Sequence, residues 1–161
     1  LKGTDDLFKD CDFLIAQFET PQAVTAAAFK QAKAHGVTTI LNPAPAKEIL
    51  PELLAVTDVV IPNESESEVL TGIAVDSEAA MLETADYFKA HGVNNLLITL
   101  GSRGVFYCTP HGHGMGHLYW GLSFAVGNRL EQRCRRLGLR ATGVQLNGPK
   151  DGGHAFDPNG S

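Results

Sequence analysis

The chain has 161 residues, of which 43% are hydrophobic, and a formal net charge of −5. This length and apolar content suit one domain of ordinary size with its own core. The sequence contains no run of 18 apolar residues, which excludes a membrane-spanning helix, and its negative charge disfavours nucleic acid as a partner. Three cysteines without paired spacing (Cys11, Cys108 and Cys134) indicate free thiols in a reducing cytoplasm.

The first predicted strands and helices have clear boundaries in the sequence. Residues 12–18 form a short apolar run that predicts a buried strand. Thr20 as N-cap and Pro21 at the first helical position then predict a helix that stops at Gly36. Residues 37–41 are β-branched and apolar, which predicts a second strand.

The middle of the chain repeats this alternation. Residues 42–46 contain two prolines and predict a loop, and residues 50–54 a short helix. Residues 58–61 predict a third strand, after which Asn63 begins a helix that ends near Gly72.

Two further strands complete the pattern. Ser77 is expected to cap a helix that runs to His91. Residues 95–100 predict a fourth strand, residues 101–104 a turn, and residues 105–107 the start of a fifth strand. Strands separated by helices predict an α/β fold, with a mostly parallel sheet and helices on both faces.

The character of the sequence changes near residue 108. Residues 1–107 carry 15 acidic and 7 basic side chains, whereas residues 108–161 carry 3 acidic and 6 basic ones and 11 of the 17 glycines. The later segment shows no steady strand period, and only residues 128–137 suggest a helix. We therefore divide the chain into residues 1–107, an α/β domain, and residues 108–161, a tail expected to be poorly ordered.

The spacing Asn63-x-x-Glu66, directly after a strand, has two interpretations. One is a capping box, in which each side chain binds the backbone N–H of the other residue. The other is a ligand site, because open α/β sheets bind ligands at the carboxyl ends of their strands. There a carboxylate could hold Mg²⁺ through water and an amide could contact a phosphate.

Three other patterns also allow more than one interpretation. Residues 99–104 (Thr-Leu-Gly-Ser-Arg-Gly) form either a tight turn or an anion-binding turn. Glu19, at the end of the first strand, either accepts hydrogen bonds from a sugar or is a solvated loop residue. The histidines at 111, 113 and 117 suggest a metal site, but their glycine neighbours favour an accidental cluster. The sequence has no P-loop and no G-x-G-x-x-G motif.

Four stretches in order and register resemble the PfkB-type sugar kinases, and ribokinases within that family. They are AQFETP at 16–21, LNPAPAKEILPELL at 41–54, DVVIPNESESEVLTGI at 58–73 and LLITLGSRGV at 96–105. The resemblance covers about the first 107 residues. It implies a ribokinase-like, Rossmann-like, doubly wound and mostly parallel sheet that is incomplete in this chain.

The resemblance also implies a function and a set of site residues. The implied reaction transfers the γ-phosphoryl group of ATP to the 5-hydroxyl of D-ribose with Mg²⁺, and the family also allows a monovalent cation and a homodimer. Asn63 would contact the nucleotide phosphates, Glu66 would influence Mg²⁺ binding, and Glu19 would contact ribose. The nucleotide site would be lined by Thr99, Leu100, Gly101, Ser102, Arg103 and Gly104.

The sequence departs from the family in two respects. The Gly-Gly-Lys-Gly-Ala-Asn segment that binds ribose in the family, and the strands that form its lid, are not found in this sequence. No Gly-Asp-[Thr/Ser]-Phe motif, which in the family holds the catalytic aspartate and the anion-hole glycines, is found anywhere in the chain. No catalytic residue is therefore assigned, and the chain alone is expected to be inactive. Two alternatives stay open: a kinase of another sugar or nucleoside, and a non-catalytic nucleotide-binding chain. Residues 108–161 are interpreted as the product of a reading-frame shift or a wrong gene model, against a genuine divergent extension.

Overall fold

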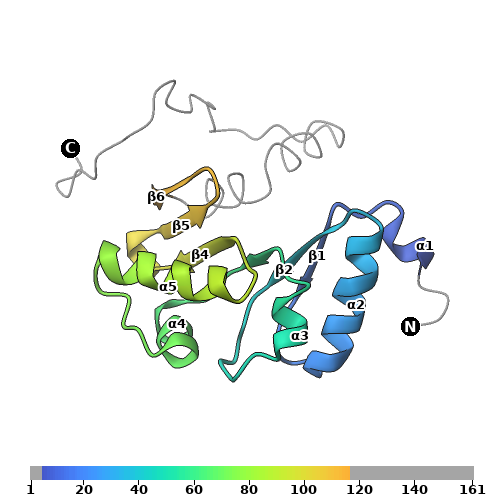
Figure 1. The fold of residues 1–161 in the computed structure, drawn as a ribbon, viewed down its shortest axis with the longest axis horizontal. Helices are drawn as coiled ribbons and strands as arrows, with labels where there is room; N and C mark the ends of the chain where they lie inside the picture. Colours follow the sequence, from blue (N-terminus) through green and yellow to red (C-terminus); the bar gives the residue numbers. More distant parts are fainter. Residues whose placement is uncertain (1–4, 117–161) are drawn as a thin grey trace.

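The computed structural model describes residues 5–116, which form a six-stranded sheet with helices packed on it (Figure 1). The strands are β1 (Phe13–Ala16), β2 (Thr38–Leu41), β3 (Val59–Val60), β4 (Asn95–Thr99), β5 (Val105–Thr109) and β6 (Gly112–Gly116). The helices are α1 (Asp5–Phe8), α2 (Gln22–Ala34), α3 (Pro51–Leu54), α4 (Glu64–Thr71) and α5 (Glu78–Ala90), with a 3₁₀ turn, η1 (Gly101–Arg103).

The strands lie in the sheet in the same order as in the chain. Strands β1 to β4 are parallel, whereas β5 runs antiparallel to β4 and β6 antiparallel to β5. The carboxyl ends of β1, β2, β3 and β4 therefore meet at one edge of the sheet. This is the edge at which open α/β sheets bind ligands, and the predicted α/β fold class with a mostly parallel sheet is confirmed.

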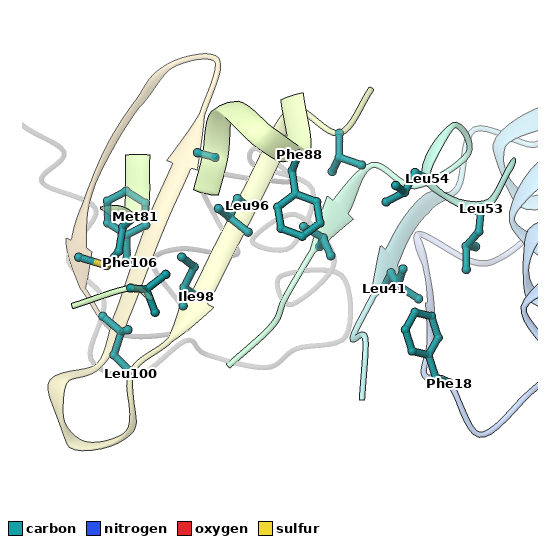
Figure 2. Packing of buried hydrophobic residues seen from close by; sticks show 14 of the residues in the cluster. Phe18, Leu41, Leu53, Leu54, Met81, Phe88, Leu96, Ile98, Leu100 and Phe106 are labelled. Carbon is teal, nitrogen blue, oxygen red and sulfur yellow. The ribbon is translucent and has the colours of Figure 1, made fainter. Parts of the chain in front are cut away.

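The main core lies between the helices and one face of the sheet. Figure 2 shows side chains from β2 and β4, such as Leu41 and Ile98, in one cluster with Leu53 of α3 and Phe88 of α5. Phe29 of α2 belongs to the same cluster and, like Phe88, is fully buried. Burying each of these large apolar side chains stabilises the fold by about 1.5–3 kcal/mol.

The opposite face of the sheet carries a second, smaller cluster. Ile40, Val59, Leu97 and Val105 form it, and among the described residues all its members come from strands or their ends. Each parallel crossover moves to the next strand in the same direction, so right-handed connections place α2, α3 and α5 on the same face. The helices of residues 5–116 thus cover one face, where the sequence predicted helices on both.

Several helix boundaries were predicted correctly because local chemistry sets them. Asn63 caps α4, Gly72 ends it in the left-handed conformation at φ +75°, and Ser77 caps α5. The predicted start of α2 was wrong by one residue, because Pro21 is extended (φ −54°, ψ 129°) and is itself the N-cap. No side-chain hydrogen bond caps this helix, so Thr20 does not have the predicted role.

The sheet does not end at Tyr107. Strand β5 continues to Thr109, and β6 pairs with it from Thr109↔Gly112 to Val105↔Gly116. The prediction that regular structure stops after Cys108 is therefore wrong for residues 108–116. Residues 117–161, which hold most of the expected poorly ordered tail, lie outside the described residues.

A polar network around the buried Thr39 side chain ties β2 to the start of β3 at the amino edge. The Thr39 hydroxyl donates to the Val56 carbonyl at 2.7 Å and accepts from the Asp58 N–H at 3.0 Å. The Asp58 carboxylate accepts from the Thr39 N–H at 2.9 Å and pairs with Lys33 of α2. Within residues 5–116, no helix has the length and apolar character needed to cross a membrane.

Candidate functional site

The backbone brings the two main predicted motifs together at the carboxyl edge. Asn63 follows β3 and Thr99 ends β4, and these two residues form a parallel β-bridge. The Thr99 N–H donates to the Pro62 carbonyl at 2.9 Å, so the two segments are hydrogen-bonded again three residues beyond Val60↔Leu96, the last pair of the β3–β4 ladder. The expectation that Asn63 and Thr99 share an edge of the sheet is confirmed.

The capping box at the start of α4 is present in full. The Glu66 N–H donates to Asn63 Oδ1 at 2.8 Å, and the Asn63 N–H donates to Glu66 Oε2 at 2.8 Å. The cap leaves Asn63 Nδ2 and Glu66 Oε1 outside these two bonds. The cap thus fixes both side chains at the edge of the sheet while one polar atom of each stays available to a ligand.

The turn between β4 and β5 depends on two glycines with positive φ. Gly101 has φ +58° and Gly104 has φ +90°, and the Leu100 N–H donates to the Gly104 carbonyl at 2.9 Å. A Cβ on Gly104 would lie 2.5 Å from the backbone oxygen of Gly116. The turn therefore has its shape because of both its own dihedral angles and the close approach of β6.

A pocket of about 560 Å³ lies between this turn and the start of α4. It is lined by Asn63, Glu64, Ser65, Thr99, Gly101, Gly104 and Val105. Four of the predicted site residues line it, and the lining comes from two segments that are more than 30 residues apart in the sequence. The backbone N–H groups at the first turn of α4 and the glycine turn are groups that suit an anion.

The other predicted residues of the turn lie outside the pocket lining. Leu100 is buried with 2% exposure and belongs to the core. Ser102 and Arg103 are exposed, and the Arg103 guanidinium makes an ion pair with the Glu64 carboxylate. Glu64, which sequence reasoning missed, thus both lines the pocket and contacts the opposite turn. The signal for it was its place next to Asn63, at the first position of the helix.

Glu19 lies at the same edge of the sheet but away from this pocket. It is exposed in the turn after β1, and β1 is three strand spacings from β4. That corresponds to about 14 Å across the sheet. The neighbouring Phe18 is held by the loop after β2, since its N–H donates to the Ala44 carbonyl at 3.0 Å and its carbonyl accepts from Lys47 Nζ at 3.1 Å.

The histidines that suggested a metal site have other surroundings. His111 is exposed at the β5–β6 turn, and His113 Nε2 lies 3.4 Å from Glu78 Oε1. His117 lies outside the described residues. Among residues 5–116, no group of three or more His, Cys, Asp or Glu side chains is arranged to hold a metal ion.

Comparisons with known proteins agree with this architecture. The model of the pfkB family carbohydrate kinases matches residues 6–119. The chain is 48% identical over 106 residues to a ribokinase of Staphylococcus aureus, an alignment that covers 66% of this chain and 35% of that protein. It is 51% identical over 106 residues to a bifunctional ribokinase/ribose-5-phosphate isomerase A of Fructilactobacillus sanfranciscensis, covering 66% of this chain and 20% of that one.

Solved structures show the same fold. The crystal structure of Sa239 superposes with a TM-score of 0.67 at 44% identity, over 71% of this chain and 38% of the other. An Arabidopsis thaliana ribokinase complexed with ribose and ATP superposes with a TM-score of 0.68 at 24% identity, over 73% of this chain and 38% of the other. The chain spans about a third of the length of the staphylococcal relative. Because the family model matches more than half of its residues, the chain belongs to the pfkB family of carbohydrate kinases.

Proposed function

We propose that the pocket between α4 and η1 binds the phosphates of Mg·ATP, as part of a ribokinase-type kinase that phosphorylates the 5-hydroxyl of D-ribose. The observation that carries the proposal is the meeting of Asn63 and Thr99 at the carboxyl edge, with a pocket between their two segments. The ribokinase of Staphylococcus aureus, at 48% identity, and the bifunctional ribokinase of Fructilactobacillus sanfranciscensis, at 51%, support ribose as the sugar.

Asn63 is the proposed phosphate contact. Its Oδ1 is already used by the helix cap, which leaves the Nδ2 donor as the part of the amide that a phosphate oxygen would take. The cap holds χ1 and χ2 of this side chain in place before the ligand arrives. A contact that is ordered in advance costs less conformational entropy on binding.

Glu66 is the proposed link to Mg²⁺. One of its oxygens accepts the Asn63 N–H, and the other is outside the cap. A single carboxylate fits Mg²⁺, which keeps several waters and is commonly bound by one or two carboxylates together with substrate phosphates. The ion would supply charge neutralisation to the phosphates, and Glu66 would orient one of its water ligands.

The sugar would lie toward Glu19, at the other end of the same edge. Its exposed carboxylate suits hydrogen bonds from sugar hydroxyls, and the β1–β4 separation of about 14 Å leaves room for a pentose and a triphosphate between Glu19 and the pocket. Phosphoryl transfer also needs a base for the sugar hydroxyl proton. No residue of this chain is assigned that role.

Isothermal titration calorimetry of the full chain with Mg·ATP tests the proposal through substitutions that keep the helix caps. Asn63→Asp keeps a good N-cap but replaces the amide donor with a negative charge. We expect its affinity for Mg·ATP to fall about tenfold or more. In Glu66→Gln, which keeps the capping box, we expect Mg²⁺ to enhance nucleotide binding less than in the wild type.

Ser77→Asp is the matched control, because Ser77 is the N-cap of α5 and lies outside the pocket. It adds the same charge at the same kind of position and should leave the affinity unchanged. If Asn63→Asp and Ser77→Asp bind Mg·ATP equally well, Asn63 has no role beyond the cap and the proposed phosphate site is wrong.

A further inference from the structure

One ion pair joins the two walls of the pocket. Arg103 lies on η1 and Glu64 is the first residue of α4, and the guanidinium binds Glu64 Oε1. The side chains are half-exposed, at 50% and 46%. The pair connects segments 39 residues apart in the sequence and is the one ion pair across this pocket among the described residues.

Glu64 places a negative charge at the pocket. Its carboxylate lines a pocket that we propose for phosphates, and like charges at close range repel each other. Arg103, the only arginine in residues 5–116, compensates that charge. The Glu64 carboxylate weakens phosphate binding by repulsion. Its pairing with Arg103 must therefore stabilise the pocket by more than this repulsion costs.

We propose that Glu64 is a positioning residue for Arg103, holding the glycine turn against the start of α4 so that the pocket keeps its width. The inference rests on the proposed function. Two features of the turn support it. Gly101 and Gly104 give η1 a backbone with few steric limits, so a side-chain restraint matters there. Arg103 itself lies outside the pocket lining, where it acts through the turn that carries it.

Glu64→Gln should change nucleotide affinity in opposite directions if Glu64 positions Arg103 and if it acts only through its charge. Glu64→Gln removes a negative charge from beside the phosphates, which by Coulomb's law alone would tighten nucleotide binding. If Glu64 positions Arg103, the same change releases the turn and weakens binding. Glutamine has nearly the same shape and keeps the helix start, so the sign of the change decides between the two.

The experiment measures the dissociation constant of Mg·ADP by calorimetry for the full chain. The variants are Glu64→Gln, Arg103→Gln, the two combined, and the exchanged pair. We expect Glu64→Gln to weaken binding about 2- to 5-fold, the range for an exposed ion pair. In an Arg103→Gln background the same change should no longer weaken binding, because no partner is left to position. The exchanged pair, Glu64→Arg with Arg103→Glu, restores the ion pair and places the positive charge beside the phosphates, so it should bind Mg·ADP at least as tightly as the wild type.

Lys33→Gln is the matched control. Lys33 pairs with Asp58 at the amino edge and is similarly half-exposed, at 38%, so its loss should leave Mg·ADP affinity unchanged. Tighter binding by Glu64→Gln, or equal weakening with and without Arg103, would overturn the inference while leaving the proposed function intact. A wild-type chain that binds no Mg·ADP would overturn the proposed function, and the inference with it.

Discussion

Gly104 lines the pocket and has a backbone conformation that L-residues with a side chain rarely adopt. Its φ of +90° is unfavourable for any side chain, and a Cβ there would meet the Gly116 oxygen at 2.5 Å. Both the strain and the contact with backbone must be relieved by movement of β5 or β6. We expect Gly104→Ala to lower the free energy of unfolding by roughly 2–4 kcal/mol, measured by urea denaturation.

Gly101→Ala is the natural comparison for that measurement. Gly101 also has a positive φ, of +58°, but nothing lies within 4 Å of its expected Cβ. The cost should be limited to the left-handed backbone, about 1–2 kcal/mol. Equal destabilisation by the two substitutions would show that the close approach of β6 to Gly104 contributes nothing.

The two described cysteines should differ in reactivity. Burial raises the pKa of the Cys108 thiol above its usual value, and the nearby Asp86 carboxylate adds to the increase. Cys11 is exposed. Because the thiolate is the reactive form, iodoacetamide at mildly alkaline pH should modify Cys11 faster than Cys108, as followed by peptide mass spectrometry. In denaturant the two rates should converge.

The raised pKa of the Cys108 thiol also predicts how the stability of the fold changes with pH. The folded state holds the Cys108 proton more tightly than the unfolded chain does, since the pKa of the thiol is raised on folding. This contribution to stability is therefore complete below the thiol pKa of the unfolded chain and is lost as the pH rises through the folded value. A native Cys108 that is modified faster than Cys11 would contradict the assigned burial.

At the residue scale, the sequence predicted those side-chain hydrogen bonds whose partner lies only a few residues away in the chain. Asn63 and Ser77 were identified as N-caps because the capping bond spans three residues. Glu64 was missed because its partner, Arg103, is 39 residues away and becomes its neighbour only when β3 and β4 pair. A pair of this kind cannot be inferred from spacing along one chain.

At the scale of elements, the amino edge of the sheet is held by the hydroxyl of Thr39. This buried group bonds both the Val56 carbonyl and the Asp58 N–H. Thr39→Val leaves the Val56 carbonyl without its donor, while the Asp58 N–H keeps its bond to the Thr39 backbone carbonyl. We expect a loss of about 1–3 kcal/mol in the free energy of unfolding.

Thr39→Ser distinguishes the contribution of the hydroxyl to stability from that of the methyl group. It keeps the hydrogen bonds and removes one methyl, so its cost should be about 1 kcal/mol. Because Thr39 lies at the edge opposite to the pocket, neither variant should change nucleotide affinity. A valine variant as stable as the serine variant would contradict the role assigned to the hydroxyl.

The elements that could be predicted are those with an apolar period or a capping residue. The strands β1 to β5 and the helices α2 to α5 were all expected, although β1 and β3 are shorter than their apolar runs. Strand β6 was missed because its sequence, Gly-His-Gly-Met-Gly, alternates glycine with larger residues and has no apolar face. It forms because β5 offers it a complete antiparallel ladder.

At the scale of the whole molecule, we expect the purified chain to show no ribose-dependent formation of ADP above background. The reason is the absence of a Gly-Asp-[Thr/Ser]-Phe motif from its 161 residues. Loss of a general base alone typically costs on the order of 10²–10⁴-fold in rate. A coupled assay with ribose, ATP and Mg²⁺ measures this, and clear Mg²⁺-dependent turnover would show that another residue acts as the base.

The origin of the later residues stays a prediction. The change in charge and glycine content after residue 107 suggested a frameshift, while the family model extends to residue 119 and β6 to Gly116. We propose that any discontinuity lies beyond that strand. Translating the other two frames of the gene decides the matter, since a frameshift requires a Gly-Asp-Thr-Phe-like motif in one of them.

The central claim is that nucleotide phosphates bind between α4 and η1, and amide chemical shifts test it most directly. In a ¹H–¹⁵N spectrum of the full chain titrated with Mg·ATP, we predict the largest shifts at Asn63, Ser65, Gly101 and Gly104, which line the pocket. Thr39 and Asp58 at the opposite edge should be unaffected, and adenosine without phosphates should shift the pocket amides much less. Saturable shifts confined to other parts of the chain, with none at the pocket, would contradict the account.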